Sequence, residues 1–272
     1  MSILEALVLG IVQGAAEFLP ISSSGHLVLV PWWLGWEKPP LLFDVIAHVG
    51  TALAVVVYFW RDWIRIVTAG VNMIRKRAIT NNDERLAFFL VAGNIPAGVL
   101  GVLLGDVFET AFSKVAIVAA MLLVTAAILF ISERLSKVGK TLTHLTWQDA
   151  LVIGLAQAVA IMPGISRSGS TIAAGLMQKL SREDAARFSF LLGTPLIFAA
   201  GALKVFEALT ADGAFDEASV LDLVVGLITS ALVGFVCIAV LLGIVRRRPL
   251  YLFVIYCAAF GLTTLAAILI RG

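Results

Sequence analysis

Two short polar segments of this 272-residue chain carry the residue types that bind anions and move protons. The first reads Glu17-Phe-Leu-Pro-Ile-Ser-Ser-Ser-Gly-His26, and the second reads Pro163-Gly-Ile-Ser-Arg-Ser-Gly-Ser-Thr171. In the second segment Arg167 offers a planar fork of donors that suits phosphate oxygens. Gly164 and Gly169 leave room for backbone N–H groups to close on an anion, and a helix starting there points its positive end at the same spot. The second segment therefore predicts an anion-binding cradle.

The first segment supplies groups for acid–base or nucleophilic chemistry. His26 carries an imidazole, which can act as a nucleophile or exchange protons near neutral pH. Glu17 could orient His26, take up its proton, or hold a divalent cation through its carboxylate oxygens. Gln13 lies four residues before Glu17, so the two side chains share one helical face and look into the same cavity. Gln13 and Glu17 are therefore the candidate ligands of such a cation.

The composition places both segments in a membrane. Of the 272 residues, 60% are hydrophobic and 14% are charged, against about 25% charged in an ordinary soluble domain; mean hydropathy is +1.01. Apolar runs of about 18 to 25 residues recur, each long enough to cross ~30 Å of hydrocarbon as a helix. Alternating strands of ~10 residues, which would indicate a closed barrel, do not appear. We predict an all-α polytopic membrane protein, a single integral membrane domain over residues 1–272 that meets the bilayer and no nucleic acid.

Six apolar segments predict full membrane spans. They cover roughly Phe43 to Trp60, Leu86 to Gly105, Val115 to Ile131, Phe188 to Leu203, Leu221 to Ile244 and Pro249 to Ile270. Two further apolar stretches, Ile3 to Trp36 and Ala150 to Leu180, are cut by the polar segments into halves of about 10 to 14 residues, too short to cross alone. Broken backbone at membrane depth is tolerated only where protein or a wet cavity covers it. Both stretches are therefore predicted to be re-entrant helix–loop–helix hairpins.

The two predicted hairpins resemble each other at a constant separation of 144 residues. Matching positions are Ala6-Leu7-Val8 with Ala150-Leu151-Val152, Gly10 with Gly154, Gln13 with Gln157, Ile21-Ser22 with Ile165-Ser166, and Ser24-Gly25 with Ser168-Gly169. Gly50-Thr51 and Gly193-Thr194 match one residue out of that register. We therefore predict an internal duplication, with repeat 1 at about 1–140 and repeat 2 at about 145–272. Three spans in each half invert the second repeat relative to the first.

The distribution of basic residues predicts the orientation. Under the six-span arrangement, 15 of the 20 Lys and Arg residues lie on one side, in the loops near residues 61–85, 134–140, 179–187 and 246–248. The positive-inside rule makes that side cytoplasmic. The loop from Glu207 to Val220, with Asp212, Asp216, Glu217 and no basic residue, then lies outside, as do both termini. The hairpins enter from opposite faces, so their tips are expected to meet near the midplane, where inverted-repeat proteins build their sites.

Length, span number and both polar segments resemble the undecaprenyl-diphosphatase family, the BacA-type bacitracin-resistance membrane phosphatases. The family's motifs stand here as Gln13 to His26 and as Pro163 to Thr171, with Gln13 where many members carry a second Glu. The resemblance implies hydrolysis of undecaprenyl diphosphate to the monophosphate at the outer face of the bacterial inner membrane, which recycles a cell-wall lipid carrier. It also implies a divalent cation, Mg²⁺ or Ca²⁺, and a homodimer.

The resemblance also implies roles for individual residues. Glu17, Ser23, His26 and Arg167 correspond to catalytic positions. The residues implied to bind substrate phosphate are Ser22, Gly164, Ser166, Ser168, Gly169 and Thr171. Whether His26 or Ser23 attacks phosphorus stays open, and His26 is favoured as the nucleophile or proton-transfer partner.

Several other interpretations of these residues remain open. Hydroxyl side chains in membrane helices often only bond to backbone carbonyls, and Arg167 could pair with Glu17 to hold the two tips together, which does not exclude phosphate binding. His48, within a predicted span, is interpreted as a packed and hydrogen-bonded histidine. An anion or lipid-phosphate transporter or flippase is the main rival function, because inverted repeats with broken helices are typical of transporters. An intramembrane protease fits less well, because Ser23 and His26 share one tip.

Overall fold

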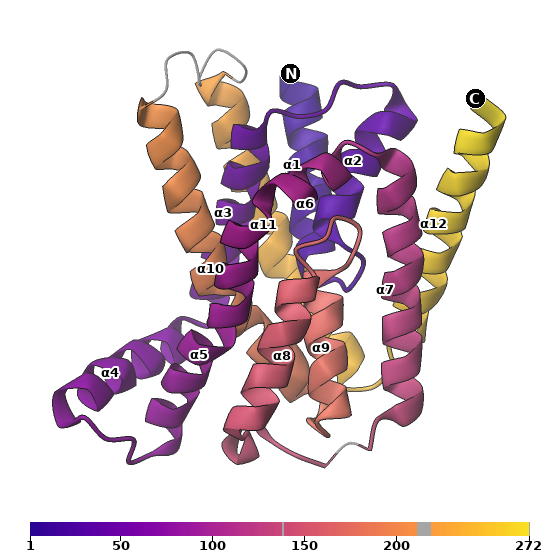
Figure 1. The fold of residues 1–272 in the computed structure, drawn as a ribbon. Coiled ribbons are helices and arrows are strands. Elements are labelled where there is room, and N and C mark those ends of the chain that lie inside the picture. Colours follow the sequence, from indigo (N-terminus) through magenta and orange to yellow (C-terminus); the bar gives the residue numbers. More distant parts are fainter. Residues whose placement is uncertain (138, 211–218, 272) are drawn as a thin grey trace.

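The computed structural model describes residues 1–137, 139–210 and 219–271. In these ranges the regular elements are helices joined by turns, with one isolated bridge between Lys140 and Leu180, so the all-α prediction is confirmed there. The helices, in chain order, are α1 (Ile3–Phe18), α2 (Ser23–Leu34), α3 (Leu41–Tyr58), α4 (Trp60–Lys76), α5 (Asn82–Leu103), α6 (Gly105–Phe112), α7 (Val115–Leu135), the short 3₁₀ helix η1 (Leu142–His144), α8 (Trp147–Val159), α9 (Arg167–Met177), α10 (Arg182–Thr210), α11 (Val220–Val245) and α12 (Tyr251–Arg271) (Figure 1).

Six helices of the described chain are long and apolar enough to cross a membrane. They are α3, α5, α7, α11, α12 and the part of α10 from Arg182 to Leu203. Each coincides with one predicted span, with bounds that differ by a few residues at the ends. The prediction of six crossings is thus confirmed by helix length and composition. The acidic residues of the predicted outer loop, Asp212, Asp216 and Glu217, lie outside the described residues.

The polar segments join two pairs of shorter helices. In Figure 1, α1 and α2 occupy the upper half of the bundle and α8 and α9 the lower half, so the two connecting turns approach each other in the middle. Both short pairs begin with a capping box, in which a hydroxyl and an acidic side chain satisfy each other's free N–H groups. Ser2 and Glu5 form the box of α1, and Thr146 and Asp149 form that of α8.

Close helix crossings fix how deep these short pairs sit. α1 packs along α11, and α8 packs along α5. A Cβ at Gly10 would lie 3.2 Å from the carbonyl oxygen of Gly226, and a Cβ at Gly154 would collide with the backbone of Gly93. Glycine lets two backbones approach closely, which is how helices pack tightly inside membranes. Two glycines that match in sequence therefore perform the same task in the two halves.

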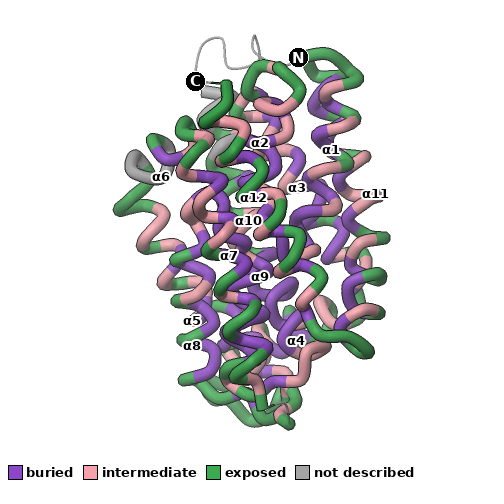
Figure 2. Tube along the Cα trace, turned by 90° about the vertical axis from the view of Figure 1, so that its right-hand side faces the viewer, coloured by how far each residue is buried: buried purple, intermediate pink, exposed green. Residues whose placement is uncertain are grey.

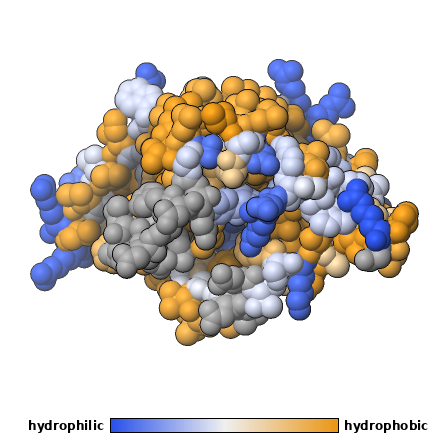
Figure 3. Space-filling model, turned by 90° about the horizontal axis from the view of Figure 1, so that it is seen from above, coloured by the Kyte–Doolittle hydropathy of each residue, from blue (hydrophilic) through white to orange (hydrophobic). Residues whose placement is uncertain are grey.

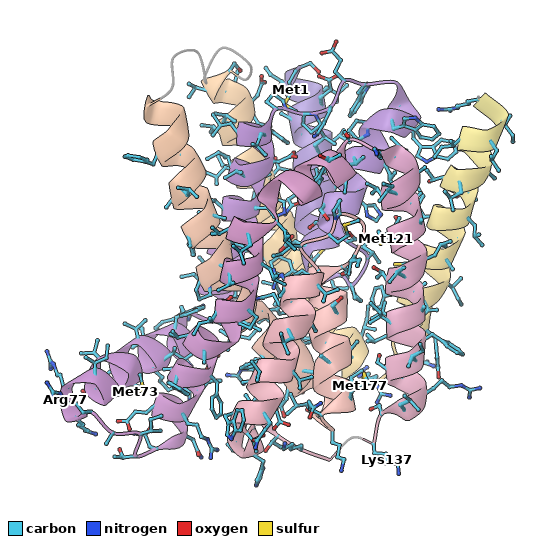
Figure 4. All side chains as sticks on the ribbon, viewed as in Figure 1. Met1, Met73, Arg77, Met121, Lys137 and Met177 are labelled. Carbon is cyan, nitrogen blue, oxygen red and sulfur yellow. The ribbon has the colours of Figure 1, made fainter. Side chains whose placement is uncertain are left out.

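The segment around residues 61–85, predicted as a long basic loop, is largely helical instead. α4 spans Trp60–Lys76 and projects sideways from the bundle before the chain turns back at Arg77 (Figures 1 and 4). Ile64, Val67 and Ile74 recur at helical spacing and are all exposed. The loop prediction was wrong because the density of basic residues hid this amphipathic period.

Buried residues run along the inward faces of the helices, and exposed ones lie outside and at the two ends (Figure 2). Seen from above, hydrophobic residues lie around much of the rim, and hydrophilic residues lie both near the middle of this face and at several points of the outline (Figure 3). Met1 lies at one end of the bundle, whereas Arg77 and Lys137 lie at the other (Figure 4). At that basic end, buried Glu133 on α7 accepts hydrogen bonds from Arg182 Nε at 3.0 Å and from the Leu250 amide at 2.9 Å. These bonds connect α7 to α10 and to the start of α12.

Candidate active site

Each polar turn ends in a residue that caps the next helix. Ser22 caps α2 by accepting a hydrogen bond from the Gly25 amide at 3.2 Å, and Ser166 caps α9 by accepting one from the Gly169 amide at 3.0 Å. The turns touch where Ser168 Oγ donates to the carbonyl of Leu19 at 3.4 Å. Two helix N-termini therefore start at one place inside the protein, and their partial positive charges favour an anion there.

A buried ion pair joins the two turns. Arg167 Nη2 lies 2.5 Å from Glu17 Oε1, and Arg167 Nη1 donates to the carbonyl of Ser189 on α10 at 3.0 Å. The side chain of Glu17 is 5% exposed and that of Arg167 is 18% exposed. The pairing interpretation of Arg167 is therefore correct. These bonds engage two of the five N–H donors of a guanidinium, which leaves donors for the oxygens of a bound anion.

Glu17 is the centre of the site because four side chains converge on its carboxylate. Besides Arg167, Ser23 Oγ donates to Oε2 at 2.6 Å and Gln13 Nε2 donates to the same oxygen at 3.1 Å. The shared helical face predicted for Gln13 and Glu17 is thus present. The fourth neighbour is His48, whose Nε2 lies 3.6 Å from Oε2. A serine this close to a buried carboxylate has an acceptor for its proton, as an activated nucleophile requires.

His26 does not join this cluster. Its Nδ1 lies 2.8 Å from the carbonyl oxygen of Ser22, and its Nε2 lies 2.7 Å from the hydroxyl of Tyr256 on α12. The ring also stacks on Tyr256 and Phe260, with centroids 5.6 Å and 5.1 Å away. Glu17 and His26, which sequence reasoning paired, therefore have different partners.

Two threonine hydroxyl groups hold the second turn together, and one of them belongs to Thr171, which is expected to bind phosphate. Thr125 Oγ1 on α7 donates to the carbonyl of Gly164 at 3.0 Å and accepts the amide of Ser166 at 2.9 Å. Thr171 Oγ1 donates back to the carbonyl of Arg167 at 2.8 Å and lies 2.6 Å from Ser189 Oγ. Thr171 thus shows the back-bonding that is common for hydroxyl side chains in membrane helices. Gly164 takes the left-handed backbone that glycine favours, with φ 90°.

Oxygen atoms are available for a divalent cation at Glu17. Gln13 Oε1 is buried without a hydrogen-bond partner, one helical turn from the carboxylate. Within the described residues no group of three or more His, Cys, Asp or Glu side chains gathers to hold a metal. Mg²⁺ and Ca²⁺ prefer oxygen ligands and often take several from a bound phosphate group. Gln13 and Glu17 therefore suit a cation that takes its remaining ligands from a phosphorylated substrate.

Sequence reasoning missed four residues that shape this site. His48 was interpreted as a packed and hydrogen-bonded histidine, and its Nδ1 does bond the carbonyl of Asp44 at 2.7 Å; its place in the site, with Nε2 facing Glu17, was missed. Ser189 and Gly193 on α10 border the guanidinium of Arg167, and Tyr256 holds His26. The repeated Gly-Thr pair at residues 50–51 and 193–194 was the available signal, since its first copy begins two residues after His48 and its second copy contains Gly193.

Comparison with known proteins finds one family over nearly the whole chain. The family model described as "Bacitracin resistance protein BacA" matches residues 6–263. A protein of Desulforudis audaxviator named undecaprenyl-diphosphatase is 44% identical over the full length of both chains. Proteins with the same name from Methanosphaera stadtmanae and Gemmatimonas aurantiaca are 42% and 39% identical, and the matches cover 97% to 100% of each chain.

Proposed function

This chain belongs to the BacA family of bacitracin resistance proteins, and we propose from that premise that it is an undecaprenyl-diphosphatase. It hydrolyses undecaprenyl diphosphate to undecaprenyl phosphate and inorganic phosphate, and so returns the lipid carrier to cell-wall synthesis. The observation that carries the proposal is the cluster of Arg167 and Ser23 on Glu17, at the place where α2 and α9 both begin. An anion cradle beside an activated hydroxyl is what cleavage of a diphosphate requires.

We propose the following chemical steps. Ser23 Oγ attacks the terminal phosphorus and its proton passes to Glu17, while the bond to the bridging oxygen breaks and undecaprenyl phosphate leaves. Water then attacks the phosphoserine, which releases inorganic phosphate and restores the hydroxyl. Arg167 and the two helix starts stabilise the charge on the phosphoryl oxygens during both displacements. Ser166, Ser168, Gly169 and Thr171 shape the phosphate cradle.

A divalent cation, Mg²⁺ or Ca²⁺, belongs to the proposal. Gln13 and Glu17 would hold it together with the diphosphate. When bound it would neutralise charge on the diphosphate oxygens. The unpartnered Oε1 of Gln13 supports this assignment, because a buried amide oxygen without a partner is costly unless a ligand satisfies it.

The membrane arrangement forms a further part of the proposal. α1–α2 and α8–α9 are re-entrant hairpins of an inverted repeat, because α1, α2, α8 and α9 are each too short to cross hydrocarbon and their turns meet deep in the bundle. The start of α2 at Ser23 and the start of α9 at Arg167 lie 144 residues apart, as in the sequence match. The helix pairs α1–α11 and α8–α5 support the same duplication, since each joins one repeat to the other.

The orientation follows from the ends of the bundle. The N-terminus and the end of α12 lie at the end opposite Arg77 and Lys137 (Figures 1 and 4), and the positive-inside rule therefore favours an outside location for both termini. The proposal opens the site to the periplasmic face of the bacterial inner membrane, as the family resemblance implies. The exposed apolar face of α4 then lies at the cytoplasmic interface. The lipid tail of the substrate stays in the bilayer throughout. Assembly as a homodimer completes the proposal and is tested by light scattering of the detergent-solubilised protein.

Phosphate release from undecaprenyl diphosphate tests the function. The purified protein in detergent is expected to release one inorganic phosphate per lipid with Mg²⁺ or Ca²⁺, to stop with EDTA, and to recover when the cation is restored. Activity that EDTA leaves intact would remove the cation from the proposal. A folded protein that releases no phosphate with any common divalent cation would overturn the proposed enzymatic activity. Transport of a lipid or an anion, measured in liposomes, would then be the function to test.

Replacing Gly193 should disturb the site without unfolding the protein. A Cβ there would meet the guanidinium of Arg167, which is the far end of a flexible side chain and can move. We expect Gly193→Ala to move Arg167 away from Glu17 and to lower kcat by about tenfold to a hundredfold, because small misplacements of a charge clamp are costly. Gly98→Ala on α5, where a Cβ meets nothing within 4 Å, is the matched control and should keep its activity. Equal activity of the two variants would show that Arg167 needs no such space.

A further inference from the structure

Both ring nitrogens of His26 are already occupied, which restricts its part in the proposed reaction. Nδ1 lies 2.8 Å from the Ser22 carbonyl oxygen, and a carbonyl only accepts, so Nδ1 carries the proton of this bond. In a neutral ring Nε2 then has the lone pair, and the Tyr256 hydroxyl 2.7 Å away donates to it. His26 is 4% exposed and packs against the rings of Tyr256 and Phe260, an environment that favours a neutral ring.

The bond from His26 is made to a strained residue. Ser22 has φ 72° and ψ 94°, a backbone conformation that residues with side chains rarely adopt. Such conformations are strained and persist only where neighbouring groups hold them. The Ser22 carbonyl accepts two bonds, one from His26 Nδ1 and one from the His26 amide at 3.1 Å. His26 is therefore part of what keeps Ser22 in this conformation.

The strained residue directly precedes the hydroxyl that faces Glu17. Ser23 is the first residue of α2, and its Oγ lies 2.6 Å from Glu17 Oε2. The direction of the peptide at Ser22 decides where α2 begins and therefore where Ser23 points. If Ser22 relaxed to an ordinary φ, the start of α2 would turn and the serine would leave the carboxylate.

α12 fixes this arrangement from outside both polar turns. Besides the Tyr256 bond, Thr264 accepts a hydrogen bond from the Trp33 ring at 3.0 Å, and Cys257 Sγ lies 3.7 Å from the carbonyl oxygen of Pro20. α12 therefore contacts the first turn and α2 at three successive levels. Of these three α12 residues, Tyr256 is the one that bonds a ring nitrogen of His26.

We infer that Tyr256 and His26 form a positioning pair: Tyr256 holds the His26 ring, His26 holds the strained Ser22 carbonyl, and Ser22 aims Ser23 at Glu17. His26 is on this view not the nucleophile, and Tyr256 on α12 becomes a determinant of the reaction rate. The inference deepens the proposed function and rests on it.

Substitutions that keep one bond at a time test the pair. Asparagine places an amide near the former Nδ1, so His26→Asn can still donate to Ser22, whereas His26→Gln reaches towards Tyr256 and loses the clamp on Ser22. We expect kcat to fall about tenfold or less in His26→Asn, the cost of roughly one hydrogen bond. It should fall further in His26→Gln and furthest in His26→Ala, with KM little changed in all three. Equal and complete loss in the three folded variants would overturn the positioning role.

Tyr256→Phe removes only the hydroxyl and keeps the stacked ring. We expect kcat to fall about threefold to tenfold with KM unchanged, since one neutral hydrogen bond is lost and no group on the substrate is affected. Tyr251→Phe on the same helix, whose ring packs near Phe130 at the basic end, is the matched control. Wild-type kcat in Tyr256→Phe would refute the part assigned to Tyr256.

The chemical form of the phosphoenzyme separates this inference from the function itself. Acid quenching during turnover should trap acid-stable phosphoserine in the wild type and also in His26→Asn. Acid-labile phosphohistidine that disappears in His26→Asn would make His26 the nucleophile and overturn the inference, while the phosphatase would stand. Failure of the wild type to release phosphate in the same assay would instead count against the proposed function.

Discussion

Replacing Arg167 with alanine is expected to lower kcat for undecaprenyl diphosphate by about 10²- to 10³-fold, the loss typical when a preorganised charge-stabilising group is removed. Arg167 lies at the start of α9 and faces Glu17 at 2.5 Å, so no other described guanidinium is placed to take over its role. Arg167→Lys keeps the positive charge without the planar fork, and only part of the rate should return. Phosphate release measured at several lipid concentrations separates kcat from KM.

Loss of folding has to be separated from loss of chemistry in this experiment. Removing Arg167 leaves Glu17 buried without its cation, which lowers stability as well as rate. Arg246→Ala is the matched control, because Arg246 makes an ion pair of the same 2.5 Å length with Glu183 at the exposed basic end. The thermal midpoint of each variant in detergent reports on folding. A folded Arg167→Ala protein within threefold of the wild-type kcat would remove Arg167 from the mechanism.

Ser23→Ala should have the largest effect of any single change, a fall in kcat of about 10⁴-fold or more, as expected when the nucleophile of a covalent mechanism is lost. Among the described residues, the side chain of Ser23 bonds only Glu17, at 2.6 Å, so its removal should hardly alter the fold. The same experiment should show no trapped phosphoenzyme after acid quenching. The turnover rate and the amount of trapped phosphoenzyme together therefore report the role of the Ser23 hydroxyl oxygen.

The neighbouring serine provides the control for this substitution. Ser24 Oγ lies 3.4 Å from Ser22 Oγ and has no bond to Glu17, so Ser24→Ala should keep kcat within about threefold, the cost of at most one weak hydrogen bond. If Ser23→Ala retained a tenth of the wild-type rate, water would have to be the attacking group. In that case Glu17 would act as its base and Ser23 would only orient the carboxylate.

The six long apolar helices of this protein could be predicted from its sequence alone. Hydropathy is a property of consecutive residues, so each span of about 20 apolar residues can be recognised without reference to the rest of the chain. The same local reasoning placed Gln13 and Glu17 on one face, because both belong to one helix. It also marked the two polar turns, since charge and glycine inside apolar runs have few explanations other than a site. Its local failure was α4, where the number of arginines concealed an amphipathic period.

Only the tertiary structure decided which side chains meet. Glu17 contacts Arg167 from 150 residues away, and His26 contacts Tyr256 from 230 residues away. Each pair depends on the depth and rotation of helices that are not neighbours in the chain, and close crossings such as Gly154 on Gly93 set that depth. A motif fixes the types of its residues but not their directions. The residues of the first turn were therefore foreseeable, while the separation of His26 from Glu17 followed from the packing of α12 against α7 and the first turn.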